Sequence, residues 1–455
     1  MTKPVTLSRR QMMRGTAAMA GAAAAQSALP AWMPRYAFAP HHQGTRGDVL
    51  ISVFLRGGAD SLNIVVPHGE EAYYTARPKL AIPRPDAGGS DPKVVDIDGF
   101  FGLHPSMAAL LPIMQAGALA AIHAAGSPHD TRSHFEAMDY MERGTPGEYG
   151  ISTGWIGRHL ATLNNGSTSP LRAIGFGVAA PAALAGPISP VALQSIVDYH
   201  LGGDAASAAR MLESINRLYA LDTGSLVESA RATRDAIDVL AAVHYAQYQP
   251  RNGAEYPQSE FALALRQTAA LIRADVGLEA ACIDLGGWDT HVNQGGAEGQ
   301  QARLLGQLAE GLAAFHADMG PDLARVSVVV MSEFGRRVQE NSGGGTDHGH
   351  GGAMLILSGG LARGGVIADW PGMEPDLLDR GEDLAITTDY RDVLAELIAL
   401  RLRNPALAEI FPNHTVRPSG IFRAQDPLPL SIVGGSSLHR EGERGRIGAL
   451  SGCAR

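Results

Sequence analysis

The sequence VSVVVMSEFGRRVQENSGGGTDHGHGG, residues 326–352, joins a short apolar run to a glycine-rich loop that carries acids and histidines. Residues 326–331 are rich in valine, which indicates a strand buried on both faces of a sheet. Asp347, His348 and His350 follow within one short segment, and carboxylates and imidazoles are ligands that divalent metals take in proteins. The alternative is a polar surface loop with solvated histidines. Polar clusters at other strand ends favour the metal site.

The composition is that of a globular protein. The chain has 455 residues, of which 45% are hydrophobic and 18% charged, and this length allows one large domain or two ordinary ones. The formal net charge is −9, so we expect no binding to nucleic acid. Cys282 lies in an apolar run and Cys453 near the end, so we expect a fold without cross-links. No segment reaches about 18 uninterrupted apolar residues, so we expect no stable membrane span.

Both ends of the chain differ from its middle. Residues 1–39 resemble a twin-arginine signal peptide, with Arg9 and Arg10, an alanine-rich apolar stretch and a small-x-small site at residues 37–39. We therefore expect the twin-arginine export machinery as a partner, and the periplasm or cell envelope as the location. The alternative is an amphipathic N-terminus. Residues 434–455 are polar with mixed charge and predict a disordered tail.

Three further strand candidates also end in polar turns. Asp289 and His291 lie two residues apart in an extended segment, so they point to the same side and suit one metal ion. Asp60 has an alternative role as the cap of a turn or helix. The positions are Asp60 after residues 49–55, Ser133 and His134 after residues 118–123, and Asp289 and His291 after residues 279–285.

Ser133 precedes a predicted helix over residues 136–143. A hydroxyl at a helix start gains from the helix dipole and from free backbone N–H groups, which favour an anionic group on its oxygen. Ser133 is therefore a candidate nucleophile or anion ligand. The alternative is that Ser133 or Thr131 is only the N-cap.

The carboxyl ends of parallel strands lie at one edge of a sheet, so these polar segments are expected to converge there. Such a site suits one or two divalent metals acting on an anionic ester, with attack by Ser133 or by water. The candidate residues are Asp60, Ser133, His134, Asp289, His291, Glu333, Asp347, His348 and His350.

In combination, several motifs resemble the domain of unknown function 1501 family over about residues 48–420. The motifs are FLRGGADSLN at 54–63, RSHF at 132–135, GWDTH at 287–291, SEFGR at 332–336, TDHGHG at 346–351 and TTDYR at 387–391. That family is placed in the alkaline-phosphatase-like superfamily, with phosphatases, sulfatases and phosphoglycerate mutases. The resemblance implies an α/β fold, a three-layer α/β/α sandwich with a mainly parallel central sheet. Alanine, leucine, arginine and glutamate at helical spacing predict a helical insertion at residues 203–275.

The resemblance also implies roles for single residues. Asp60 would be the metal ligand of the first strand, Ser133 the nucleophile with His134 beside it, and Asp289 and His291 a pair on one metal. The Asp-His pair of the superfamily is matched either by Asp347 and His348 or, in place after a strand, by Glu333. In the second case His348 or His350 supplies the late histidine. The spacing of Asp289 and His291 is tighter than in the superfamily, and no sulfatase-type Cys/Ser-x-Pro-x-Arg block is present.

We therefore expect an exported metal-dependent hydrolase of phosphate or sulfate esters. It would use one or two divalent ions, with zinc first and manganese, magnesium or calcium as alternatives. Its substrate would be a small anionic ester or a sulfated or phosphorylated glycan. The alternative is a non-catalytic envelope or carbohydrate-binding protein that retains the fold. A phosphomutase or transferase would use the same ligands.

Overall fold

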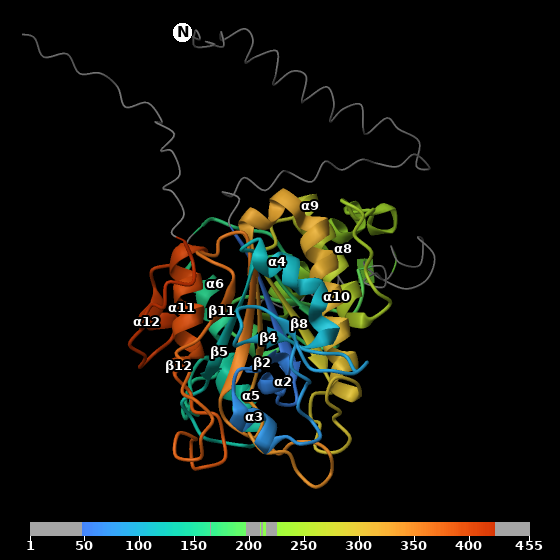
Figure 1. Cartoon of the computed structure of the whole chain (residues 1–455). Helices are drawn as coiled ribbons and strands as arrows, with labels where there is room; N and C mark the ends of the chain where they lie inside the picture. The colour runs from blue at the N-terminus through green and yellow to red at the C-terminus, as the bar shows by residue number, and fades with distance from the viewer. Residues whose placement is uncertain (1–47, 164, 197–209, 211–212, 215–224, 424–455) are drawn as a thin grey trace, which may run out of the picture.

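The computed structural model describes residues 48–163, 165–196, 210, 213–214 and 225–423, which form a mixed α/β structure around a mainly parallel central sheet (Figure 1). The expected signal peptide and tail, and residues 203–209, 211–212 and 215–224 of the expected helical insertion, lie outside these residues. Among the described residues, no helix is both long and apolar enough to cross a membrane.

The central sheet has the strand order β11-β5-β10-β9-β1-β8-β6-β7, and β12 also pairs with β5. A second, three-stranded sheet has the order β2-β4-β3. The strands of the central sheet are β1 (Val49–Arg56), β5 (Leu119–Gly126), β6 (Ala173–Phe176), β7 (Val191–Leu193), β8 (Ala280–Gly286), β9 (Val326–Ser332), β10 (Gly352–Ser358), β11 (Gly365–Ile367) and β12 (Thr388–Asp389). Those of the small sheet are β2 (Val65–Val66), β3 (Val95–Asp96) and β4 (Gly102–Leu103).

Helices cover both faces of the central sheet (Figure 1). Alternate residues of β1 point to opposite faces, so Ile51 and Val53 pack in one core cluster and Leu50 and Phe54 in the other. The α-helices are α2 (Ser61–Ile64), α3 (Glu71–Ala76), α4 (Leu111–Gln115), α5 (His134–Arg143), α6 (Trp155–Thr162), α8 (Ser225–Ala242), α9 (Glu260–Ala274), α10 (Gln300–Met319), α11 (Tyr390–Leu400) and α12 (Leu407–Ile410). The 3₁₀ helices are η1 (Pro105–Leu110), η2 (Ala182–Leu184), η3 (Tyr245–Gln247) and η4 (Gly320–Arg325).

The two faces use different helices. The cluster that contains Ile51 also contains residues of α9 and α10, such as Leu265 and Leu308. The cluster that contains Leu50 also contains residues of α6 and α11, such as Leu160 and Leu394. Because each strand buries side chains on both faces, the central strands are apolar almost without interruption, as the sequence of β9 predicted.

One strand runs against the others and positions the candidate site. β10 pairs antiparallel with β5 and β9, whereas β1 pairs parallel with β8 and β9. The carboxyl ends of β1, β5, β8 and β9 therefore share one edge with the amino end of β10. The loop 333–351 leaves β9 and returns into β10 at that edge, so the acids and histidines of this loop stay beside the other strand ends.

Candidate metal centre

The edge formed by β5, β8, β9 and β10 brings together most of the predicted site residues. His134 is the first residue of α5, which follows β5 through a short loop. The gathered residues are His134, Asp289, His291, Glu333, Asp347 and His348, which are joined to one another by the contacts described below. Ser133 is next to His134 in the chain, while Asp60 and His350 have other partners.

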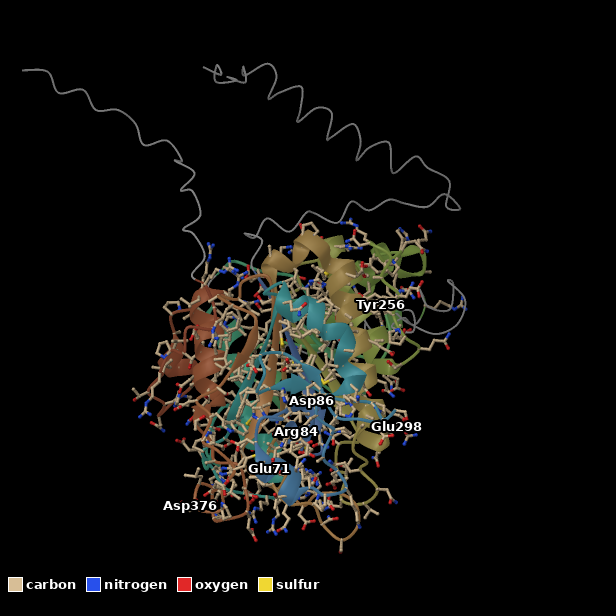
Figure 2. The ribbon with its side chains drawn as sticks, viewed as in Figure 1. Glu71, Arg84, Asp86, Tyr256, Glu298 and Asp376 are labelled. Atoms are coloured by element: carbon tan, nitrogen blue, oxygen red, sulfur yellow. The ribbon has the colours of Figure 1, made fainter. Side chains whose placement is uncertain are left out.

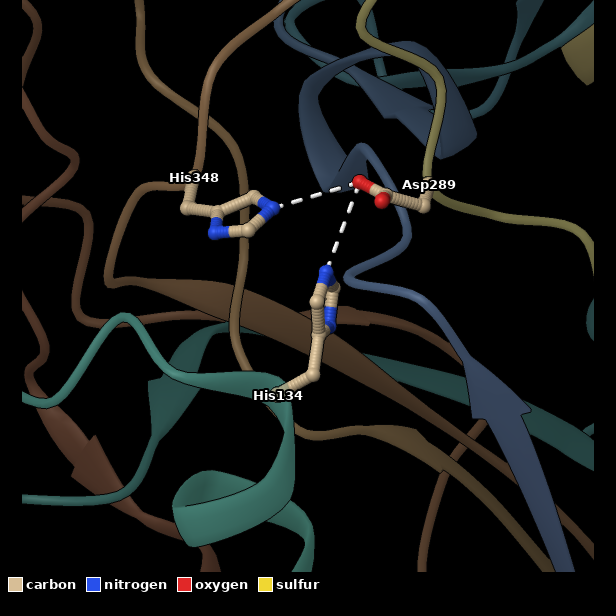
Figure 3. Close-up of side chains that lie close together, drawn as sticks. All are labelled: His134, Asp289 and His348. Carbon is tan, nitrogen blue, oxygen red and sulfur yellow. Dashed lines mark hydrogen bonds and ion pairs between the residues drawn. The ribbon is translucent and has the colours of Figure 1, made fainter.

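Three of these residues offer ligand atoms to one point (Figure 3). His134 Nε2 lies 3.4 Å from Asp289 Oδ1, and His348 Nε2 lies 3.2 Å from the same oxygen. One ligand atom from each residue lies within 4.8 Å of the others. Tetrahedral zinc with bonds of about 2.0–2.2 Å holds its ligand atoms about 3.3–3.6 Å apart, so the separations to Asp289 are close to those of a metal site.

His291 borders this triad. Its Nε2 lies 3.1 Å from Asp289 Oδ1 and 2.9 Å from His348 Nε2. The side chains of Asp289 and His291 therefore lie in contact, and their role as ligands of one metal stays a prediction.

In all three histidines the other ring nitrogen faces an oxygen. His134 Nδ1 lies 2.7 Å from Glu333 Oε1, His291 Nδ1 lies 3.1 Å from Asp347 Oδ1, and His348 Nδ1 lies 2.8 Å from the carbonyl oxygen of Arg132. An ionised carboxylate or a carbonyl can only accept, so each Nδ1 carries the hydrogen in the neutral ring, and each Nε2 keeps its lone pair. A cation satisfies Nε2 lone pairs that face one another and a carboxylate.

The surroundings of His134 show whether the site suits a metal ion. Its Nε2 is buried and has no hydrogen-bond partner. The hydrogen bond to Glu333 raises the pKa of His134 and so increases its basicity as a ligand. The pairing of a carboxylate with Nδ1 behind an available Nε2 is the arrangement that surrounds metal-bound histidines. The residues present therefore fit a divalent metal ion.

Asp289 is held as a carboxylate by a buried arginine. The guanidinium of Arg336 donates to Asp289 Oδ1 at 2.7 Å and also bonds the backbone carbonyls of Gly58 and Thr346. Burial raises the pKa of Asp289, but the hydrogen bond and positive charge of Arg336 oppose it, and the pKa is lowered to about 2. Conversely, burial lowers the pKa of His348, which keeps its ring neutral and able to bind metal.

Glu333 stands behind the triad, although the sequence predicted it as a ligand. It is 1% exposed, and Oε1 accepts from His134 Nδ1 and from the backbone N–H of Gly57 at 2.8 Å. Burial favours the protonated acid, but the hydrogen bonds from His134 and from backbone amides hold the pKa of Glu333 below its usual value. Glu333 therefore orients His134.

The turn after β1 requires glycine at position 57, whose backbone N–H donates to Glu333 Oε1. Gly57 has a φ of 124°, and a Cβ on it would lie 2.5 Å from the backbone nitrogen of Asp289. A side chain at this position would push apart the β1 turn and the segment that carries Asp289 and His291. Gly57 thus lets the β1 turn lie against the Asp289 segment while its N–H donates to Glu333.

Asp347 has a role similar to that of Glu333 but is more exposed. Its side chain is 49% exposed, and Oδ1 contacts His291 Nδ1 and accepts from Asn341 Nδ2 at 3.0 Å. The hydrogen bonds from Asn341 and His291 lower the pKa of Asp347. The sequence predicted Asp347 as a metal ligand, whereas the structure places it against the far nitrogen of His291.

Asp60 does not join the metal centre. It is buried, and Oδ2 accepts from Arg77 and from Gln294 Nε2, both at 2.6 Å. The alternative role also differs, because Asp60 precedes α2 without a side-chain capping bond. Asp60 is therefore one half of a buried ion pair with Arg77, a partner that its local sequence did not indicate.

His350 also lies outside the ligand set. Its Nδ1 is 2.7 Å from Asp379 Oδ2, and its Nε2 is 3.0 Å from the carbonyl oxygen of Ser127. Both ring nitrogens are occupied, so His350 links three loops and offers no lone pair to an ion. Its place in the motif TDHGHG predicted a ligand, but the side chain points to another segment.

Ser133 occupies the N-cap position of α5, as one of the alternatives predicted, but its side chain makes no capping hydrogen bond. The residue is exposed and immediately precedes His134. The hydroxyl is thus not engaged as a cap. It remains a candidate nucleophile beside the metal centre.

Sequence reasoning missed Arg336, Asn341 and the carbonyl of Arg132. Arg336 stood in the motif SEFGR as a conspicuous neighbour of Glu333, and that was the only signal for it. The roles of Asn341 and of a backbone carbonyl depend on contacts across loops, which leave no mark in the local sequence.

Comparison with known proteins identifies a family. The family model described as "Protein of unknown function (DUF1501)" matches residues 48–391. No curated protein matches the chain. Among solved structures, the chain is similar to "Structure of PH0037 protein from Pyrococcus horikoshii", with 12% sequence identity and a TM-score of 0.28, over 71% of this chain and 93% of that chain.

Proposed function

The chain belongs to the DUF1501 family, and we propose that it is a metal-dependent hydrolase of phosphate or sulfate esters. The observation that carries the proposal is the set of Nε2 atoms around Asp289 Oδ1, each on a ring whose Nδ1 is held by an oxygen. Zinc is the first candidate because imidazole and carboxylate ligands suit it, with manganese, magnesium and calcium as alternatives.

Each residue has a defined part in the proposed site. His134, His348 and Asp289 would hold the ion, and His291 would complete its surroundings. A bound divalent ion acts as a Lewis acid on a phosphoryl or sulfuryl oxygen. Glu333 and Asp347 hold the rings of His134 and His291 in orientation.

Ser133 is the proposed nucleophile, with water as the alternative. Its hydroxyl stands at the amino end of α5, where unpaired backbone N–H groups and the helix dipole favour negative charge. It is also the neighbour of His134 in the chain, which supports a place for it in the site. A hydroxyl used for capping would be less available for this role.

We also propose a fold superfamily and a cellular location, both of which the sequence suggests. The motifs and the polar strand ends support an alkaline-phosphatase-like arrangement, and the paired arginines Arg9 and Arg10 support export by the twin-arginine route to the periplasm or cell envelope. A mononuclear centre is favoured over two ions, because Asp60 is engaged by Arg77 and His350 by Asp379.

The test is turnover of 4-nitrophenyl phosphate and 4-nitrophenyl sulfate by the full chain, after loading with zinc or manganese and after chelation. We expect hydrolysis of one of the two esters that chelation abolishes and metal restores. Ser133→Ala should lower kcat at least about 100-fold if the serine attacks. Ser419→Ala is the control, because this exposed serine lies in the C-terminal segment, where its backbone N–H donates to Glu396, and it makes no contact with the metal-centre residues.

A metal-loaded, folded protein that hydrolyses neither ester would contradict the proposal. In that case the non-catalytic envelope or carbohydrate-binding protein would be the better account. Full activity of Ser133→Ala with retained metal dependence would instead assign the attack to water.

A further inference from the structure

A cavity of about 490 Å³ adjoins the metal centre. It lies between α3, the loop after β9 and residues 373–382. Its size falls in the range of about 300–1,000 Å³ that small-molecule pockets occupy. Part of its wall is apolar, with Ala76, Val338, Met373 and Leu378. The cavity can therefore hold a small organic group.

Asp347 and Asn341 connect the cavity to the metal centre. Both line the cavity, and Asn341 donates to Asp347, which in turn contacts His291 Nδ1 at 3.1 Å. The wall of the cavity thus contains the residue that orients one of the histidines. His134, Asp289, His291 and His348 do not line the cavity, so an ester with its anionic group at the ion would pass His291 and Asp347 to place its alcohol portion in this space.

The charged lining of the cavity is mostly acidic. Among the described residues that line it, the one cationic side chain is that of Arg337, which is paired with Glu382 at 2.7 Å. The carboxylates are those of Glu71, Glu340, Asp347, Glu374 and Glu382.

The negative charges of these carboxylates are neutralised by ion pairs to different extents. Glu71 is paired with Arg84 at 2.7 Å, and both are labelled in Figure 2. Glu340 accepts from the backbone N–H groups of Lys79 and Leu80, and in the described part of the chain neither it nor Glu374 forms an ion pair. Negative charge therefore remains in excess, and it disfavours a second anionic group and favours a cation.

We propose that this cavity binds the alcohol portion of the substrate, and that this portion is an apolar group carrying an organic ammonium. The inference rests on the proposed hydrolase function for its role in catalysis. It narrows the substrate to an ester with one anionic group, held at the ion, and a cationic group, held among the carboxylates. A sulfated or phosphorylated glycan with several anionic groups would not fit this lining.

Binding is tested first, with calorimetric titration of the full chain by benzyltrimethylammonium, and by benzoate as a ring of similar size with opposite charge. We expect the ammonium probe to bind and benzoate to bind at least about fivefold more weakly. Glu374→Lys should weaken binding of the ammonium probe about fivefold. Glu310→Lys is the matched control, because it makes the same charge change on α10, which does not line the cavity.

A second variant tests the place of binding. Thr75 is exposed and lines the cavity, so Thr75→Trp should occupy part of it and weaken binding of the ammonium probe without unfolding the protein. Equal binding of benzoate and the ammonium probe would overturn the proposal. So would ammonium binding that neither Glu374→Lys nor Thr75→Trp reduces.

Activity then separates this inference from the proposed function. Phenyl phosphates with a 4-trimethylammonio or a 4-carboxylate substituent are compared in wild type and in Glu374→Lys, so that intrinsic leaving-group reactivity cancels. We expect Glu374→Lys to lower the cation-to-anion ratio of kcat/KM about fivefold or more. An unchanged ratio in an active enzyme would overturn the inference and leave the function standing. Glu374-dependent ammonium binding without hydrolysis of any ester would support a cation-binding cavity and overturn the hydrolase.

Discussion

The histidines of the metal centre and those of the core differ in what their second ring nitrogen contacts. In the core, His104 Nδ1 accepts from the N–H of Ser106 and Nε2 donates to the carbonyl of Gly296, both at 3.0 Å. His123 is satisfied in the same way by Ala124 and Val65. At the metal centre, Nδ1 faces an oxygen while Nε2 faces another imidazole or a carboxylate.

The difference shows how a ligand histidine is recognised. A neutral ring has one donor and one acceptor, and in His104 and His123 both are used by the backbone. In His134 the donor is used by Glu333 and the acceptor has no hydrogen-bond partner. Core histidines are therefore expected to support stability, and the site histidines to support metal binding.

The largest expected effect is on metal affinity, and it comes from replacing a histidine of the metal centre by alanine. His134→Ala removes a ligand atom, so metal affinity should fall more than about 100-fold, beyond the usual effect of changing a residue behind the ligands. The metal-free protein should also lose some stability, because the buried Glu333 carboxylate loses its partner, so metal affinity is the quantity that separates the two roles. Metal titration and thermal unfolding of the metal-free protein are the measurements.

His104→Ala is the matched control. His104 is fully buried, and its removal leaves the N–H of Ser106 and the carbonyl of Gly296 without their partner. We expect a loss of about 1–3 kcal/mol for each unsatisfied group and an unchanged metal affinity. Equal loss of metal affinity in both variants would refute the distinction.

The second effect is a pH dependence of stability that comes from the core. Burial lowers the pKa of His123 from 6.5 to about 4. The unfolded state therefore takes up the proton first as the pH falls, and His123 lowers stability between pH 6.5 and 4, by about 3 kcal/mol in all. Above pH 6.5 this loss is absent.

Denaturant unfolding of metal-free wild type and of His123→Gln, from pH 7.5 to pH 4, measures this loss. The variant should have the flatter pH dependence whatever its stability at neutral pH, because Gln does not titrate. Parallel curves would show that His123 is not the group responsible.

The third effect concerns the residue behind His134. Glu333→Gln keeps an oxygen that can accept from Gly57 but removes the charge that raises the basicity of His134. We expect metal affinity to fall about 10- to 100-fold with the fold retained. An unchanged affinity would mean that Glu333 contributes only its contact to the β1 turn.

The smallest effect is expected at Asp347. Asp347→Asn retains a possible acceptor for His291, and the side chain is already 49% exposed, so its charge is screened by solvent. We expect metal affinity to fall less than about tenfold. A loss as large as that of His134→Ala would instead make Asp347 a direct ligand, as the sequence predicted.

The sequence predicted much of the fold because buried parallel strands are visible as continuous apolar runs. The runs at 49–55, 279–285 and 326–331 correspond to β1, β8 and β9. The convergence of their polar ends then followed from the topology of a parallel sheet. The direction of β10 could not be predicted, because the residues of an apolar run do not show which way the strand runs in the sheet. Yet the antiparallel direction of β10 keeps His348 at the site.

Individual roles in the site were harder to predict. Asp60 follows a strand in the same way as Asp289. However, Asp60 forms a buried ion pair with Arg77, whereas Arg336 orients Asp289 toward the histidines. Glu333 and Asp347 have ligand chemistry, but the geometry places them one step behind the histidines. These distinctions depend on contacts between segments distant in the chain, so residue type and spacing cannot supply them.

The most direct measurement is the metal content of the purified full chain by elemental analysis, beside the double variant Asp289→Ala with His348→Ala. The control is Asp379→Ala with His350→Ala, a neighbouring Asp–His pair that lies outside the ligand set. We expect about one equivalent of a divalent metal in wild type and in the control, and none in the first double variant. A folded wild type that contains no metal and takes up none when it is added would contradict the account.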